Sequence, residues 1–330
     1  MSEALLSIKD LRTSFRIGTE YYAAVDGLNV EIKRHEVFAL VGESGCGKSA
    51  FALSLTRLHN LHYTRITGEV EFQGQNILAM PESKINQVRG RNIGMIFQDP
   101  LVALNPLIRV GKQIEETLMY HTNLSKSARK ERAIELLSEV GMYNPALTYR
   151  QLPHELSGGM RQRAMIAIAI ACKPDLVIAD EPTTALDVTI QAQILDLLRA
   201  LQHEMQSSII LITHDLGVVA EMADRVAVMY AGQIVELAPS KVLFKNPQHP
   251  YTRSLLASIP SLNEEINRLH VIKGVVPDLK NLPRSGCRFS LRTPWIPNHV
   301  HEEEPTYHEV EPEHLVLCTC YNDFGFEDEL

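Results

Sequence analysis

Residues 42–49 have the types and spacing needed to hold a chain of phosphates. They read Gly-Glu-Ser-Gly-Cys-Gly-Lys-Ser, which matches the phosphate-binding pattern G-x-x-x-x-G-K-S at every position. Lys48 is expected to reach the β- and γ-phosphates, and the Ser49 hydroxyl is expected to ligate Mg²⁺. The candidate nucleotide contacts of this loop are Gly42, Glu43, Ser44, Gly45, Cys46, Gly47, Lys48, Ser49 and Ala50.

The flanks of this loop decide between phosphate binding and a plain glycine-rich turn. Residues 37–41 are an apolar run typical of a buried strand, and residues 50–58 have the pattern of a helix. A helix that begins directly after the loop aims N–H groups and the positive end of its dipole at an anion. The sequence therefore favours a nucleotide site over a turn that binds nothing.

Two adjacent carboxylates follow a second apolar run. Residues 176–181 read Leu-Val-Ile-Ala-Asp-Glu. At the end of a buried strand, Asp180 could hold Mg²⁺ and Glu181 could face an attacking water. The alternative is a solvated turn, which the apolar strand and the phosphate loop make the weaker interpretation.

A second helix start rich in small residues lies at Leu156, Ser157, Gly158, Gly159 and Met160. Its N–H groups could bind another phosphate. Taken by itself, this segment is better explained as a plain helix cap. His214, which follows an apolar strand, would by itself also be interpreted as structural.

Composition limits the class of protein. The 330 residues carry a net charge of −8 with a pI near 5.9, which argues against a broad nucleic-acid footprint. No secretory signal is visible at the start. The longest apolar run, residues 164–172, is shorter than the roughly 20 residues of a membrane-spanning helix. We therefore expect a soluble chain that reaches a membrane only through a partner.

The order of the elements predicts an α/β fold. Alternating strands and helices flank an insert at about residues 100–160 whose pattern is helical, with Ser125 as the cap of a helix that runs to Val140. Residues 68–76 predict an antiparallel hairpin. Prolines become frequent after about residue 237, so helices there should be few and short. We expect a nucleotide-binding domain at residues 1–255 and a loop-rich C-terminal extension at 256–330.

Six segments together resemble the ATP-binding-cassette (ABC) ATPases. They look like the Walker A, Q-loop, signature, Walker B, D-loop and H-loop motifs of that family, and they stand in its order: residues 42–49, Gln98, residues 156–160, residues 180–181, residues 185–187 and His214. The resemblance implies an ABC-type P-loop ATPase with a RecA-like core, an antiparallel β subdomain and a helical insert. It also implies ATP and Mg²⁺ as ligands.

The resemblance assigns roles to single residues. The implied catalytic residues are Glu181 as the water-activating carboxylate, His214 near the γ-phosphate, and Gln98, which would contact Mg²⁺ or the lytic water. Ser49, Gln98 and Asp180 would surround Mg²⁺. Phe15 stands where the family stacks an aromatic ring on adenine, although Tyr21 and Tyr22 are nearby alternatives and a core phenylalanine is another.

The family also implies a head-to-tail dimer, in which two chains share two ATP molecules. The signature segment, Leu156 to Met160, would then act on the ATP of the partner subunit, and Asp187 would couple the two chains. This gives the second helix start a function that it lacks in a monomer.

Residues around the motifs narrow the resemblance. Segments 95–106, 181–193, 229–233 and 249–252 are similar to the ATP-binding subunits of oligopeptide and dipeptide importers, specifically the D-type subunit. The implied partners are an F-type homologue as heterodimer, two membrane permeases and an external substrate-binding protein, with no nucleic acid. The implied location is the cytoplasmic face of the membrane, peripheral through the permeases.

Other functions remain as alternatives. Nickel and glutathione importers share these features, so the resemblance identifies the type of transporter more specifically than its cargo. ABC proteins of DNA repair or translation usually carry a long coiled coil, zinc fingers or two cassettes, which are not visible here. A plain P-loop module or kinase-like phosphotransferase would not need the signature segment.

The five cysteines pose a question about the extension. Their odd number and the phosphate loop point to a reducing cytoplasm. Many relatives hold an iron–sulfur cluster with four cysteines in the extension, but here Thr293 and Val300 replace two of them. Cys287 and Cys318 keep their places and Cys320 is extra. These cysteines with His299 and His301 could bind zinc by ligand type, yet their spacing matches no strong zinc signature. We expect neither metal, with packing in place of the lost ligands.

Overall fold

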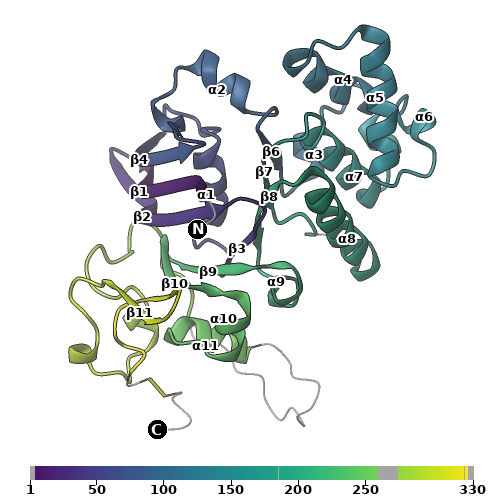
Figure 1. The fold of residues 1–330 in the computed structure, drawn as a ribbon. Helices are drawn as coiled ribbons and strands as arrows, with labels where there is room; N and C mark the ends of the chain where they lie inside the picture. The colour runs from purple at the N-terminus through teal and green to yellow at the C-terminus, as the bar shows by residue number, and fades with distance from the viewer. Residues whose placement is uncertain (1–3, 185, 259–273, 323, 326–330) are drawn as a thin grey trace. The chain divides into compact units, whose positions relative to one another are not determined.

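The computed structural model describes residues 4–184, 186–258, 274–322 and 324–325 (Figure 1). The chain forms two compact units, each built from separate parts of the sequence. The first unit contains residues 4–6, 32–37 and 72–212. The second unit contains residues 7–31, 38–71 and those from 213 onward.

The core of the first unit is a parallel arrangement of three short strands. β7 (Leu176–Asp180) lies between β6 (Ile93–Ile96) and β8 (Ser208–Thr213), with Ile178 opposite both Met95 and Ile210. Every residue of β7 and β8 is buried. Continuous apolar runs of this kind are typical of parallel strands that are covered on both faces.

Helices make up most of the rest of the first unit, and Figure 1 draws them in colours from blue (α2) through teal to green (α8). Ser125 caps α5 by accepting a hydrogen bond from the Ala128 N–H at 3.3 Å, and Gly141 with φ of 76° follows its end, so the helix predicted there is confirmed. The elements are β5 (Gln75–Asn76), η1 (Ile77–Ala79), α2 (Glu82–Val88), α3 (Pro100–Ala103), α4 (Val110–His121), α5 (Lys126–Glu139), α6 (Pro145–Thr148), η2 (Pro153–Glu155), α7 (Gly158–Ala169) and α8 (Val188–Met205).

The second unit contains two sheets. In one, β1 lies between β2 and β4. In the other, β3 pairs in parallel with β9, and β10 pairs antiparallel with β9. Their bounds are β1 (Ala4–Ile17), β2 (Glu20–Lys33), β4 (Thr64–Phe72), β3 (Val37–Val41), β9 (Arg225–Tyr230) and β10 (Gln233–Pro239). The helices of this unit are α1 (Lys48–Leu55), α9 (Leu216–Met222), α10 (Ser240–Lys245) and α11 (Pro250–Ala257).

The C-terminal extension contributes two strands that the sequence did not predict. β12 (His314–Leu317) pairs antiparallel with β10, and β11 (Tyr307–Glu311) pairs with β12. The fully buried imidazole of His314 lies 2.8 Å from the Glu236 carboxylate of β10, which ties the hairpin to the sheet. Two short helical turns, η3 (Ser290–Arg292) and η4 (Asn298–Val300), precede the hairpin.

The C-terminal segments belong to the apolar core of the second unit. Leu282, Phe289, Leu317 and Cys320 lie in one buried cluster with residues of β3, β9 and β10. The expectation of a loop-rich extension is therefore correct for residues 274–306 but misses the strands that follow. None of the helices in the described ranges is long and apolar enough to cross a membrane.

Candidate functional site

The phosphate loop lies between β3 and α1, in the second unit, as its flanks predict. Lys48 is 5% exposed, and its ammonium group donates hydrogen bonds to the carbonyl oxygens of Gly42 at 2.7 Å and Glu43 at 3.0 Å. Ser44, Gly45 and Ser49 are exposed. A buried ammonium group, an exposed hydroxyl and a helix N-terminus thus lie on one loop, which fits the phosphates and Mg²⁺ of a bound nucleotide.

Close packing explains why this loop needs glycine at one particular position. Gly47 has φ of 112°, which side chains rarely adopt. A Cβ atom there would also overlap the carbonyl oxygen of Ala24 and approach Met229 Cε to 2.8 Å. The backbone of the loop can follow this path only without a side chain at residue 47.

A brace from the C-terminal part of the second unit holds the phosphate loop at Glu43. The Glu43 N–H donates to the hydroxyl oxygen of Tyr251 at 2.8 Å. Arg292, 4% exposed, donates to the Glu43 carboxylate at 2.5 Å. The rings of Tyr230, Tyr251 and Phe289 pack together beneath these contacts.

Sequence reasoning missed this brace. In the sequence, residues 249–252 indicate only a resemblance to the importer subunits, and no pattern singles out Arg292. The contacts join residues 208 and 249 positions apart, so no local spacing could reveal them.

The paired carboxylates lie at the end of β7, in the first unit. Asp180 is buried at 5% exposure. The Glu181 N–H donates to the Ile212 carbonyl at 2.8 Å, and φ of 46° turns this residue out of the strand. Its carboxylate accepts hydrogen bonds from Gln98 Nε2 at 3.0 Å and from Thr184 Oγ1 at 2.8 Å.

These contacts hold the Glu181 carboxylate in one orientation. They also bring together Gln98 and Glu181, two predicted site residues that are 83 positions apart. Thr184 was not predicted, although it lies three residues after Glu181 in the segment quoted for the resemblance. An oriented carboxylate with an amide beside it can position and polarise a water molecule.

The signature segment begins α7. Ser157 caps the helix by accepting from the Met160 N–H at 3.3 Å, while Leu156 is buried and anchors the segment. Ser157 and Gly158 are exposed, so the start of α7 is open to solvent. A Cβ at Gly159 would lie 2.8 Å from Ile190 Cγ2, which explains a small residue there.

Three further predicted residues lie at exposed or partly exposed positions. Asp187 caps α8 by accepting from the Ile190 N–H at 3.0 Å. His214 is exposed directly after β8, ahead of the Asp215 cap of α9. Phe15, on β1, meets the ring of His59 edge-on at 5.3 Å.

The two alternative aromatic residues for adenine have partners of their own. The Arg65 guanidinium covers the Tyr21 ring at 3.8 Å. The Tyr22 hydroxyl donates to Glu20 at 2.7 Å, and the exposed Arg284 lies 5.9 Å from its ring.

Comparisons with known proteins agree with these motifs. The ABC transporter family matches residues 25–184, and the oligopeptide/dipeptide transporter C-terminal region matches residues 235–295. An oligopeptide transport ATP-binding protein of Lactococcus lactis is 47% identical over 99% of this chain and 97% of its own length. The chain belongs to the ATP-binding subunits of ABC transporters. Another relative, an oligopeptide transport ATP-binding protein of Bacillus subtilis, is 46% identical over 98% of both chains.

Solved structures support the same family. A dimeric ATP-binding cassette bound to ADP and phosphate, in a post-hydrolysis state, superposes with a TM-score of 0.64 at 27% identity, covering 71% of this chain and 98% of its own. A structure of cbiO1 from Clostridium perfringens, described as part of the ABC transporter complex cbiONQ, gives a TM-score of 0.63 at 26% identity, covering 74% of this chain and 92% of its own. This ABC ATPase therefore has the P-loop cassette fold and hydrolyses ATP, with Mg²⁺ as the usual metal of such cassettes and membrane permeases as the usual partners.

Proposed function

We propose that this chain is the motor subunit of an importer that takes up oligopeptides or dipeptides. The observation that carries the proposal is the similarity to oligopeptide transport ATP-binding proteins over nearly the whole chain, with every motif residue present. The match of residues 235–295 to the C-terminal region of oligopeptide/dipeptide transporters adds support outside the cassette. Nickel or glutathione as cargo is the alternative within the same machine.

In this proposal the phosphate loop and the carboxylates have separate tasks. Lys48 and the N-terminus of α1 bind the phosphates, and Ser49, Gln98 and Asp180 surround Mg²⁺. Glu181, oriented by Gln98 and Thr184, accepts a proton from the attacking water or aligns it. His214 contacts the γ-phosphate, and Phe15 packs on adenine because the Tyr21 ring is already covered.

The exposed start of α7 supports a dimer in which each chain completes the other's site. Ser157 and Gly158 are exposed at this helix start, where their N–H groups could donate hydrogen bonds to a phosphate bound to a second cassette. Asp187 would couple the two chains. We propose an F-type homologue as the second cassette, so that the pair is a heterodimer.

An exposed apolar surface supports docking to the permeases. Leu101, Val102 and Leu107 follow shortly after Gln98 and are 58%, 84% and 87% exposed. Large apolar side chains this exposed are typical of a protein contact. Permease movement could therefore reach Gln98 and Glu181 over a short stretch of chain. The location would be the cytoplasmic face of the membrane, with cargo delivered by an external binding protein.

We propose that the chain has two domains. Residues 1–255 would form the nucleotide-binding domain, with the helical subdomain at about 100–160, and residues 256–330 would form the extension.

The Glu181→Gln variant tests the hydrolytic role. The amide keeps the size and one acceptor oxygen but cannot take a proton, so steady ATP hydrolysis in the assembled transporter should fall by about 10²–10⁴-fold while nucleotide binding is retained. A closed dimer should accumulate with ATP. Glu204→Gln, at an exposed position of α8, is the matched control and should hydrolyse ATP at the wild-type rate.

Hydrolysis by Glu181→Gln at the wild-type rate would refute the role of Glu181. Uptake measurements distinguish a peptide cargo from nickel or glutathione. Cells that lack this chain should lose uptake of a radiolabelled oligopeptide but keep uptake of nickel and glutathione. Unchanged peptide uptake would refute the peptide assignment and leave the ATPase assignment intact.

A further inference from the structure

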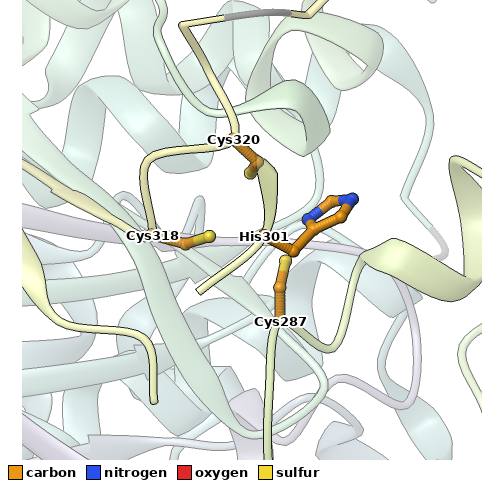
Figure 2. Close-up of side chains that lie close together, drawn as sticks. All are labelled: Cys287, His301, Cys318 and Cys320. Atoms are coloured by element: carbon orange, nitrogen blue, oxygen red, sulfur yellow. The ribbon is translucent and has the colours of Figure 1, made fainter. Parts of the chain in front are cut away.

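Four metal-binding side chains lie together in the C-terminal extension. The thiols of Cys287, Cys318 and Cys320 and the imidazole of His301 place one ligand atom each within 4.8 Å of one another. The three cysteines are 7%, 1% and 0% exposed, and His301 is partly buried. Figure 2 shows the sulfur atoms and the ring converging from separate loop segments.

This ligand set differs from the four-cysteine pattern that the family resemblance implies for an iron–sulfur cluster. Thr293 is buried, and its hydroxyl donates to the Phe289 carbonyl at 3.4 Å. Val300 packs against the apolar core. Neither can act as a thiolate ligand, so these positions do not fit a cluster held by four cysteines. His301 and Cys320 lie beside the two remaining cysteines instead.

We propose that Cys287, His301, Cys318 and Cys320 bind a single zinc ion in a tetrahedral site. Zinc bonds of about 2.3 Å to sulfur and about 2.0 Å to nitrogen place tetrahedral ligand atoms about 3.5–3.8 Å apart. The ligand atoms all lie within 4.8 Å of one another, which exceeds the tetrahedral separation by at most about 1 Å. A four-iron cluster has its iron and sulfide atoms inside the ligand set and needs wider spacing. Three thiolates and one imidazole are a common structural zinc set.

The surroundings of the ligands support a bound cation. Both ring nitrogens of His301 are buried and make no hydrogen bond of normal geometry within the ranges that the structure describes, although the ring lies beside the Cys318 thiol. A buried ring nitrogen left without a partner is unfavourable, and a metal bond would use one of them. The Glu302 N–H points at Cys318 Sγ at 3.4 Å, an arrangement that stabilises a thiolate ligand.

The site would connect three segments of the extension to the brace of the phosphate loop. Cys287 is followed directly by Arg288, which pairs with Asp26, and by Phe289, which packs on Tyr251. Arg292, the partner of Glu43, lies on the next turn. Zinc loss should therefore loosen the segment that holds Glu43.

Metal analysis of the full-length wild-type chain, purified without a histidine tag under anaerobic conditions, tests the proposal directly. We expect one zinc per chain, little iron and no acid-labile sulfide. Cobalt substitution should produce the intense visible bands of tetrahedral cobalt bound to thiolates. The test does not depend on transport or ATP hydrolysis, so its outcome is separate from that of the proposed function.

Variants locate the metal. Cys320→Ser and His301→Ala should each retain less than about a tenth of the wild-type zinc, whereas Cys172→Ser, a partly buried cysteine of the first unit, should retain all of it. A strong zinc chelator should lower the thermal unfolding midpoint of the wild type and of Cys172→Ser.

Three results would overturn the proposal. They are a wild-type chain without stoichiometric metal, iron with sulfide in place of zinc, and zinc that is retained in both His301→Ala and Cys320→Ser. Because the first two use only the wild type, the proposal stays testable even if a variant fails to fold.

Discussion

Replacing Tyr251 by phenylalanine should weaken nucleotide binding, although Tyr251 is not itself a predicted nucleotide contact. Tyr251 is fully buried, and its hydroxyl oxygen accepts the Glu43 N–H at 2.8 Å. Phenylalanine keeps the ring and its packing but removes the acceptor. A buried donor left unpaired costs about 1–3 kcal/mol, and the half-buried Glu43 puts the cost near the lower end, about 1 kcal/mol.

This cost falls on the conformation of the loop that binds phosphate. If that conformation loses about 1 kcal/mol against its alternatives, the apparent affinity for ATP falls by up to about fivefold. Titration of Mg-ATP by calorimetry, in chains that also carry Glu181→Gln to prevent turnover, measures the change. Tyr143→Phe, at a fully exposed position, is the matched control and should bind as the parent does.

A double-mutant cycle extends this test to the second contact of the brace. Arg292→Gln removes the charge that pairs with Glu43, and combining it with Tyr251→Phe should give a non-additive loss of affinity. If Tyr251→Phe binds ATP and unfolds as the parent protein does, the proposed brace does not hold the loop, and the reasoning is refuted.

Two further predictions follow from local geometry. Gly47→Ala should abolish measurable ATP binding while the chain stays folded, because the added Cβ overlaps the Ala24 carbonyl; binding within twofold of wild type would contradict the packing argument. Burial lowers the pKa of His249 to about 4. Because the unfolded chain takes up this proton near pH 6.5 and the folded chain does not, the free energy of unfolding should fall by about 3 kcal/mol between pH 6.5 and pH 4. In His249→Asn, whose side chain can still accept the Tyr251 N–H, the free energy of unfolding measured by chemical denaturation should depend less on pH than in the wild type. An equal pH dependence in the two proteins would contradict this prediction.

Features built from consecutive residues were predictable. The phosphate loop, the carboxylates after β7, the Ser125 cap and the Ser157 cap each depend on one strand or one helix end, and the structure has all of them in place. Their geometry follows from backbone hydrogen bonding over a few residues, which residue types and spacing determine.

Contacts between distant segments were decided only by tertiary structure. Gln98 meets Glu181 because two strands far apart in the sequence, β6 and β7, end side by side. Tyr251 meets Glu43 because helix α11 packs beside the loop that follows β3. No spacing rule encodes such pairs.

The C-terminal extension gives the clearest contrast between what the sequence predicts and what the tertiary structure shows. The sequence shows the metal-binding residue types, but their spacing matched no zinc signature, so it predicted that no metal is bound. The structure brings Cys318 and Cys320 beside Cys287 because β12 pairs with β10, and the buried contact of His314 with Glu236 joins the same two strands. The sequence thus determined which ligand atoms are available, and strand pairing decided that four of them meet, because only the folded chain offsets the entropy of bringing distant loops together.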